Sequence, residues 1–118
     1  MKTDRREFGD WGEKVAAWYL QKKGYRVIDK NVQFRDGEID LVALKDGLLI
    51  FVEIKTRKTA GFGSVSAINQ TKQNRIRRAA IRFCKQEGLS AATQFDAVVI
   101  IGSQESKEIS IQHFRNCF

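Results

Sequence analysis

The segment GEIDLVALKDGLLIFVEIKTR, residues 37–57, contains two apolar stretches joined by Asp46-Gly47. Asp-Gly is a preferred two-residue loop of a β-hairpin. In such a hairpin Lys45 faces Leu48, and this pair sets the register of the two strands. The segment therefore predicts two antiparallel strands, residues 38–45 and 48–57, in the centre of a sheet.

Carboxylates interrupt this apolar hairpin. The predicted register places Asp40 opposite Glu53 and Glu38 opposite Lys55, and alternation puts all four side chains on one face. They share that face with Val42, Leu44 and Phe51, which indicates partial burial. Opposed carboxylates repel, and their removal from water costs several kcal/mol more unless something compensates. One hypothesis is that a hard divalent cation such as Mg²⁺ compensates, with Lys55 neutralising charge, positioning a water or meeting a phosphate. The alternative is a solvated face on which Lys55 pairs with Glu38.

Elements predicted on either side of the hairpin complete an α/β fold. Helical periodicity and turn residues predict helices over residues 4–23 and from Ser64 or Ser66 to Gly88, and further strands over 25–34, 94–102 and 108–114. The predicted order is αβββαββ, a mixed sheet flanked by helices in a single domain, residues 1–118. The loop after the third strand contains Phe62 between glycines, which fits a mobile flap over substrate or a contact for another protein.

Each predicted helix has a patterned face. In the first helix, aromatic and aliphatic residues recur at helical spacing: Phe8, Trp11, Val15, Trp18, Tyr19 and Leu20. In the second, a basic stripe of Arg75, Arg78, Arg82 and Lys85 lies opposite an apolar face of Ile68, Ile76, Ala79, Ala80 and Phe83. The basic stripe is either a phosphate-binding surface, together with Arg57, Lys58 and Lys72, or a solvated helix face.

Composition narrows the classes of function. The net charge of +7 favours a polyanionic partner such as nucleic acid. Two cysteines and one histidine, His113, suit neither a zinc site nor a disulfide scaffold, and His113 is expected to be structural. The charged N-terminus resembles no signal peptide, and no apolar run is long enough to span a bilayer. We expect a cytoplasmic protein without a membrane partner.

At this point the sequence resembles a known family. GEID (37–40) followed by FVEIKTR (51–57) is similar to the PD-(D/E)xK signature of restriction-endonuclease-like nucleases. More narrowly, the whole chain resembles the YraN family of small bacterial proteins, and its architecture is similar to that of archaeal-type Holliday junction resolvases. Further matching positions are Gly12, Glu13, Tyr19, Leu20, Gly63, Lys72 and the strand FDAVVI (95–100).

The resemblance implies a role for each matching position. Asp40 and Glu53 would be metal ligands for Mg²⁺ or Mn²⁺, together with the main-chain carbonyl of Ile54, and Lys55 would be the catalytic lysine. Glu13 matches a helix carboxylate beside the metal, although a glutamate on an amphipathic helix is commonly just solvated. Ile39 stands where the signature has proline.

The resulting expectation is a metal-dependent DNA endonuclease that acts on branched or structured DNA, as a homodimer if the substrate is a two-fold symmetric junction. The alternative is a non-catalytic nucleic-acid-binding domain that retains the nuclease fold. A scaffold that recruits another protein is a third interpretation.

Overall fold

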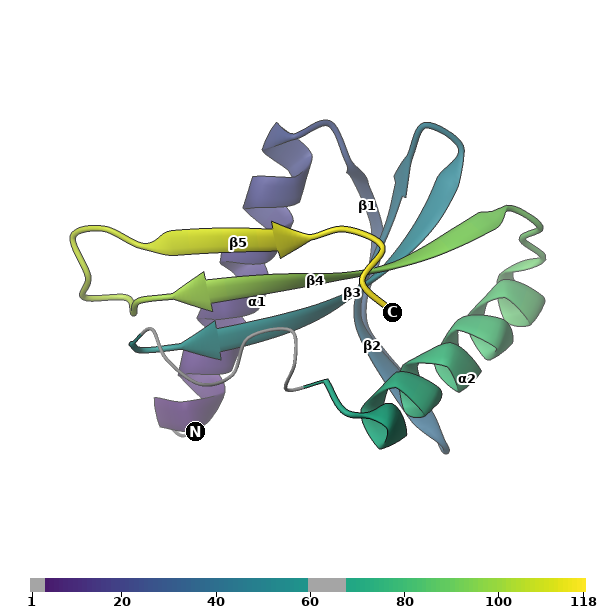
Figure 1. Ribbon diagram of the computed structural model, residues 1–118, viewed down its shortest axis with the longest axis horizontal. Coiled ribbons are helices and arrows are strands. Elements are labelled where there is room, and N and C mark those ends of the chain that lie inside the picture. Colours follow the sequence, from purple (N-terminus) through teal and green to yellow (C-terminus); the bar gives the residue numbers. More distant parts are fainter. Residues whose placement is uncertain (1–3, 60–67) are drawn as a thin grey trace.

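Figure 1 shows the computed structural model of the chain, which describes residues 4–59 and 68–118. The elements are α1 (Asp4–Lys22), β1 (Arg26–Phe34), β2 (Gly37–Lys45), β3 (Leu48–Arg57), α2 (Gln70–Glu87), β4 (Ala92–Ile101) and β5 (Ser110–Phe114). The predicted α/β class and the order αβββαββ are confirmed. The predicted loop residue Phe62 lies outside the described residues.

All five strands belong to one mixed sheet with the spatial order β1-β2-β3-β4-β5. Neighbouring strands are antiparallel except β3 and β4, which are parallel. Parallel neighbours need a crossover connection, and α2 lies in that connection. The sheet is therefore an antiparallel meander from β1 to β3, and β3 and β4 are its one pair of neighbours that run in the same direction.

The hairpin of β2 and β3 has the predicted register over its central part. Lys45 pairs with Leu48, and the pairing continues as far as Leu41 with Val52. Asp46 and Gly47 both have positive φ angles, 50° and 78°, as a type I′ turn requires. The pairing does not continue to Asp40 and Glu53 or to Glu38 and Lys55, so these two predicted main-chain pairs are wrong. The strands separate where the carboxylates begin.

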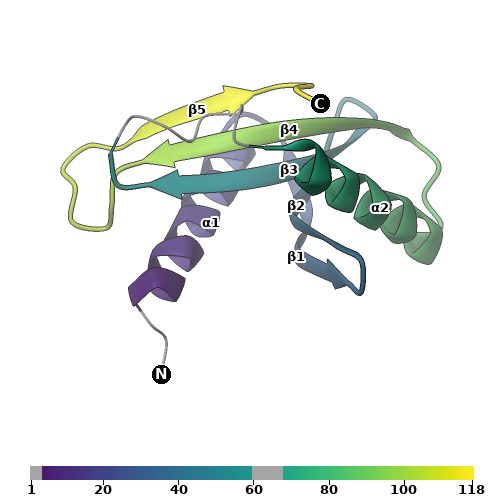
Figure 2. The same cartoon turned by 60° about the horizontal axis from the view of Figure 1, so that its bottom comes forward.

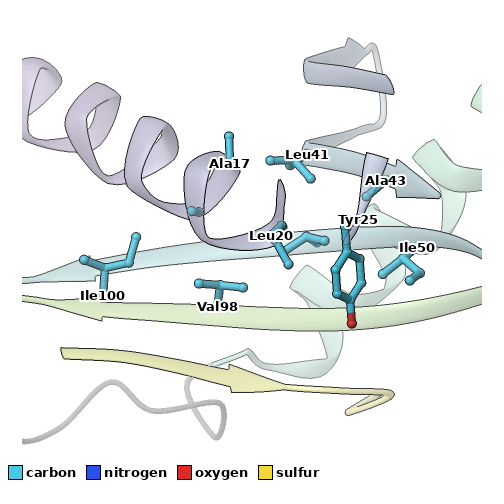
Figure 3. Packing of buried hydrophobic residues seen from close by; sticks show 10 residues of the cluster. Ala17, Leu20, Tyr25, Leu41, Ala43, Ile50, Val98 and Ile100 are labelled. Carbon is cyan, nitrogen blue, oxygen red and sulfur yellow. The ribbon is translucent and has the colours of Figure 1, made fainter. Parts of the chain in front are cut away.

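The two helices pack on opposite faces of the sheet (Figure 2). On the α1 face, Ala17 and Leu20 contact apolar residues of the central strands (Figure 3), with Leu41, Ala43, Ile50, Val98 and Ile100 in the same cluster. On the α2 face, Ile76, Ala79 and Phe83 pack with Val42, Leu49 and Phe51. Because the central strands are buried on both faces, they read as continuous apolar runs.

The buried face of α1 follows the predicted stripe only in part: Leu20 is buried and Trp11, Val15 and Tyr19 are partly buried against the same cluster, but small residues are buried beside them. Gly12, Ala16, Ala17 and Leu20 are buried, whereas Trp18 is 56% exposed. A methyl group at position 12 would overlap the side chain of Thr56. The absence of a side chain at Gly12 thus lets α1 lie directly on the end of β3.

Helix α2 begins later than predicted. Its N-cap is Asn69, whose side chain accepts a hydrogen bond from the Lys72 main-chain N–H at 2.8 Å. The predicted caps Ser64 and Ser66 lie outside the described residues and precede this cap, so they do not start the helix. The predicted end is confirmed, because Gly88 is the C-cap in the left-handed conformation. The predicted apolar face of α2 is also buried.

A buried polar cluster joins β4 to β5. Asp96 is fully buried and accepts hydrogen bonds from Gln94, from the main-chain N–H of Asn116 and from His113. These contacts hold the pKa of Asp96 below its ordinary value despite burial, which acts in the opposite direction.

In the described part of the chain, neither helix is long and apolar enough to cross a membrane.

Candidate active site

Asp40 lies at the point where β2 and β3 separate. Its Oδ2 accepts a hydrogen bond of 2.8 Å from the main-chain N–H of Ile54. The side chain therefore satisfies a donor that a continued strand ladder would have satisfied. This contact fixes the carboxyl group of Asp40 between the two strands.

Glu53 lies next to it on β3 and is buried, with a side-chain exposure of 6%. Its Oε2 has no hydrogen-bond partner among the described residues. The ammonium of Lys72 lies 3.4 Å from this oxygen, close enough for charge attraction but not aligned as a hydrogen bond. Leaving a buried carboxylate oxygen without a donor is costly. The site therefore contains an oxygen atom that is poised to accept a ligand.

The two carboxyl groups interact with each other. Burial, followed by the hydrogen bond and the charge of Glu53, raises the pKa of Asp40 from 3.8 to about 8. The Ile54 N–H and the Lys72 charge act in the opposite direction. A hydrogen bond between two carboxyl groups requires a proton on one of them, so the pair holds a proton near neutral pH in the absence of a cation. Although the predicted strand pairing is wrong, the predicted juxtaposition of Asp40 and Glu53 is present.

The pair opens into a polar cleft of about 490 Å³ between α1, β3 and α2. Its charged lining residues are Arg5, Glu13, Asp40, Glu53, Lys55, Arg57 and Lys72. Arg5 was not predicted as a site residue. Arg5, Gly9 and Glu13 are four residues apart and therefore lie on the same face of α1. This spacing in the sequence could have indicated that Arg5 lies on the same side of the helix as Glu13.

Glu13 lies in the wall of this cleft. Its Oε2 accepts a hydrogen bond of 3.2 Å from the side-chain amide of Asn31. Burial is the main cause that raises its pKa, and Asp40 adds to it, whereas Asn31 lowers it. Glu13 does not close a three-carboxylate site, because the described residues contain no group of three or more His, Cys, Asp or Glu side chains placed to hold one ion. The structure brings Glu13 into the cleft but not into the carboxylate pair.

Lys55 also lines the cleft, two residues after Glu53. The alternative interpretation, in which it pairs with Glu38 on a solvated face, is wrong. Glu38 instead binds α2, through Lys72 Nζ at 3.3 Å and Arg75 Nη2 at 2.7 Å. These contacts lower the pKa of Glu38, with the Arg75 hydrogen bond as the largest cause.

Two further cations of the α2 stripe, Arg78 and Arg82, bind the turn before β2. Arg82 donates two hydrogen bonds to the carboxylate of Asp36, at 2.9 and 3.2 Å, and Arg78 lies 3.9 Å from the same carboxylate. Much of the charge of this stripe is therefore compensated within the protein. Less of its charge is left uncompensated than the sequence pattern indicates.

Two further predicted nucleic-acid contacts follow the carboxylates on β3. Arg57 lines the cleft and donates a hydrogen bond of 3.0 Å to the carbonyl of Thr56. Lys58 is exposed, and its ammonium lies over the ring of Phe8 at 5.7 Å. Both cations thus stand beside the cleft and close to the N-terminal turns of α1.

A larger hollow, about 670 Å³, lies at the other end of α2. Its lining is mostly apolar, with Ala80, Ile81, Leu89 and Phe95, and contains no carboxylate. The chemistry of the residues, and not the size of the hollow, makes the smaller cleft the candidate active site.

The donor set of the cleft fits a hard divalent cation. Mg²⁺ and Mn²⁺ prefer oxygen ligands, and Mg²⁺ commonly takes one or two protein carboxylates and completes its shell with waters and substrate. Asp40 and Glu53 supply two adjacent carboxyl groups, and Glu53 Oε2 lacks a donor. A cation would remove the repulsion that otherwise keeps a proton on the pair.

Comparison with known proteins gives one family. The model of the family described as "Uncharacterised protein family UPF0102" matches residues 12–100, which include both carboxylates and the helix α2. A UPF0102 protein of Syntrophomonas wolfei is 41% identical over 96% of this chain and 98% of its own length. A UPF0102 protein of Alkaliphilus metalliredigens is 40% identical over 96% of this chain and 98% of its own length. A UPF0102 protein of Geobacter sulfurreducens is 41% identical over 91% of this chain and 84% of its own length.

Proposed function

The chain belongs to the UPF0102 (YraN) family, and we propose that it is a metal-dependent DNA endonuclease that acts on branched or otherwise structured DNA. The observation that carries this proposal is the pairing of the partly buried Asp40 with the buried Glu53 in a polar cleft that also contains four cationic side chains. A buried carboxylate pair is expensive for stability, so its presence favours a functional role.

In the proposed reaction, Asp40 and Glu53 would hold Mg²⁺ or Mn²⁺, together with the main-chain carbonyl of Ile54. When bound, such an ion supplies a Lewis acid for the phosphoryl oxygen and lowers the pKa of an attacking water. Lys55 lies beside the pair and holds either the water or the scissile phosphate through its ammonium. Glu13, which also lines the cleft, would orient water.

The same cleft offers the cations that DNA binding requires. Arg5 and Arg57 lie on its two sides, on α1 and β3, and neither forms an ion pair among the described residues. Phosphate contacts of this kind give affinity without sequence specificity. The preference for branched DNA, and a homodimer for a two-fold junction, rest on the resemblance to junction resolvases.

The test is cleavage of labelled single-stranded, duplex, flap and four-way-junction DNA at low salt with Mg²⁺ or Mn²⁺. The wild type is compared with Glu53→Gln and with Glu87→Gln, an exposed residue at the other end of α2. We expect the wild type and Glu87→Gln to cut, and Glu53→Gln to bind DNA without cutting. Equal cutting by Glu53→Gln would contradict the proposal. Binding without cutting by all three proteins would favour a non-catalytic nucleic-acid-binding domain.

A further inference from the structure

Lys72 is the only charged residue of α2 that reaches the buried carboxylate pair in the described structure. Its ammonium lies 3.4 Å from Glu53 Oε2 and 3.3 Å from Glu38 Oε1. The side chain is 35% exposed, so one side faces the cleft while the other contacts the two glutamates. It therefore stands between the candidate metal ligands and a second carboxylate outside them.

The backbone of Lys72 is held in place independently of these contacts. Its main-chain N–H donates to the N-cap side chain of Asn69 at 2.8 Å, within the first turn of α2. Glu38 is held from the other side, because Arg75 Nη2 contacts its Oε2 at 2.7 Å. A methyl group on Gly37 would overlap the Arg75 carbonyl, so the start of β2 lies directly against α2. The Lys72 ammonium contacts both glutamates at once, so only its side chain needs to move for it to leave Glu53 and stay on Glu38.

We infer that Lys72 is a resident counter-ion of the metal site, which bridges Glu53 and Glu38 in the metal-free protein and keeps only Glu38 when a divalent cation binds Glu53. This inference rests on the proposed function, because it assumes that Asp40 and Glu53 are the ligands. The lysine ammonium and the cation compete for Glu53 Oε2, which has no other partner among the described residues. Glu38 retains the ammonium that the cation displaces from Glu53 and so favours the metal-bound form.

The inference predicts opposite effects of two substitutions. Lys72→Met keeps the length of the side chain and removes its charge, so a cation no longer has to displace the ammonium. We expect Mn²⁺ to bind about tenfold more tightly, the size that a partly buried ion pair can contribute. Glu38→Gln removes the alternative carboxylate and leaves Lys72 committed to Glu53, so we expect Mn²⁺ to bind several-fold more weakly.

Lys85→Met is the matched control. Lys85 lies on the same helix, is exposed, and lines the apolar hollow at the far end of α2. The Lys85→Met substitution removes one positive charge, as Lys72→Met does, but at a position that does not contact the carboxylates. We expect its Mn²⁺ affinity to stay within about twofold of the wild type, since exposed charges at such a distance are screened by salt.

The experiment is titration of each full-length protein with Mn²⁺ alone, followed by electron paramagnetic resonance of the free ion, without DNA. Urea unfolding in EDTA verifies that each variant is folded. Tighter binding by Lys72→Met together with weaker binding by Glu38→Gln supports the inference. If Lys72→Met is folded and binds Mn²⁺ no more tightly than the wild type, the inference is overturned. If Lys72→Met does not fold, Glu38→Gln decides, and unchanged or tighter Mn²⁺ binding by that variant overturns the inference.

The proposed function can survive or fail separately. If the wild type binds Mn²⁺ and cuts DNA while the substitutions have no effect on affinity, the nuclease stands and the counter-ion role does not. If the wild type and Glu53→Gln bind Mn²⁺ equally weakly, the metal site and the counter-ion are both excluded.

Discussion

Asp40→Asn should make the metal-free protein more stable, and increasingly so as the pH rises. The asparagine carbonyl can still accept from the Ile54 N–H, and its amide can donate to the neighbouring Glu53 carboxylate. The substitution therefore imitates the protonated form permanently. It removes the repulsion that follows when both carboxyl groups ionise.

The magnitude follows from the raised pKa of Asp40, about 8 in the folded protein against 3.8 ordinarily. Between these values the folded protein holds a proton that the unfolded chain has lost, so the free energy of unfolding falls as the pH rises. The slope is about 1.4 kcal/mol per pH unit, which gives a loss of about 3 kcal/mol between about pH 5.5 and about pH 8. That loss is a large fraction of the about 5–15 kcal/mol that stabilises a typical domain.

The assay is urea unfolding in EDTA, followed by circular dichroism at several pH values across this window. Since other groups also titrate, the quantity to compare is the difference between Asp40→Asn and the wild type at each pH. We expect this difference to grow by about 3 kcal/mol from the lowest to the highest pH. Asp29→Asn, at an exposed position on β1, is the matched control and should show no such growth.

A divalent cation should reverse the effect in the wild type alone. At about pH 8, saturating Mn²⁺ should raise the wild-type midpoint of unfolding and leave Asp40→Asn nearly unchanged, because the variant lacks one ligand charge. Parallel stability profiles of the two proteins in EDTA would refute the reasoning, since the carboxyl groups would then not share a proton. Equal stabilisation of both by Mn²⁺ would show that Asp40 is not a ligand.

Other substitutions test the packing and the cationic surface. Gly12→Ala should destabilise the protein by about 1–3 kcal/mol in urea unfolding, because the methyl group overlaps Thr56. Gly9→Ala, which has open space around it, should be neutral or stabilising. Equal effects of the two substitutions would mean that α1 does not approach β3 this closely. Arg5→Met should weaken DNA binding and reduce the slope of log affinity against log salt by about 1. Arg82→Met should change that slope less, since Arg82 is paired with Asp36; a larger change for Arg82→Met would place the DNA on α2 instead of the cleft.

Local signals in the sequence account for most of the fold. The Asp46-Gly47 turn fixed the hairpin register, because a two-residue loop with two positive φ angles allows only one pairing next to it. Gly88 likewise marked the end of α2. Such signals act within a few residues, and reading them needs no knowledge of the tertiary structure.

Two local predictions were wrong because a stronger or less visible signal was present. The stripe of α1 predicted Trp18 on the buried face, but close packing against β3 favours small residues such as Gly12, and Trp18 is left exposed while Trp11 and Tyr19 are partly buried. Asn69 caps α2 in place of an earlier serine. Asparagine and serine are both favoured N-cap residues, so residue type alone could not decide between them.

The sequence by itself determined the order of the elements, the hairpin and the meeting of Asp40 with Glu53, because each depends on spacing along the chain. The tertiary structure decided the partners of the charges. Lys72 lies 34 residues from Glu38, and Arg82 lies 46 from Asp36, yet packing of α2 on the sheet brings them into contact. It also decided that the strands separate at Asp40, where a side chain takes the place of a main-chain carbonyl. Electrostatic interactions act through space, so a basic stripe that looks free in sequence can be neutralised by residues that only the fold brings near.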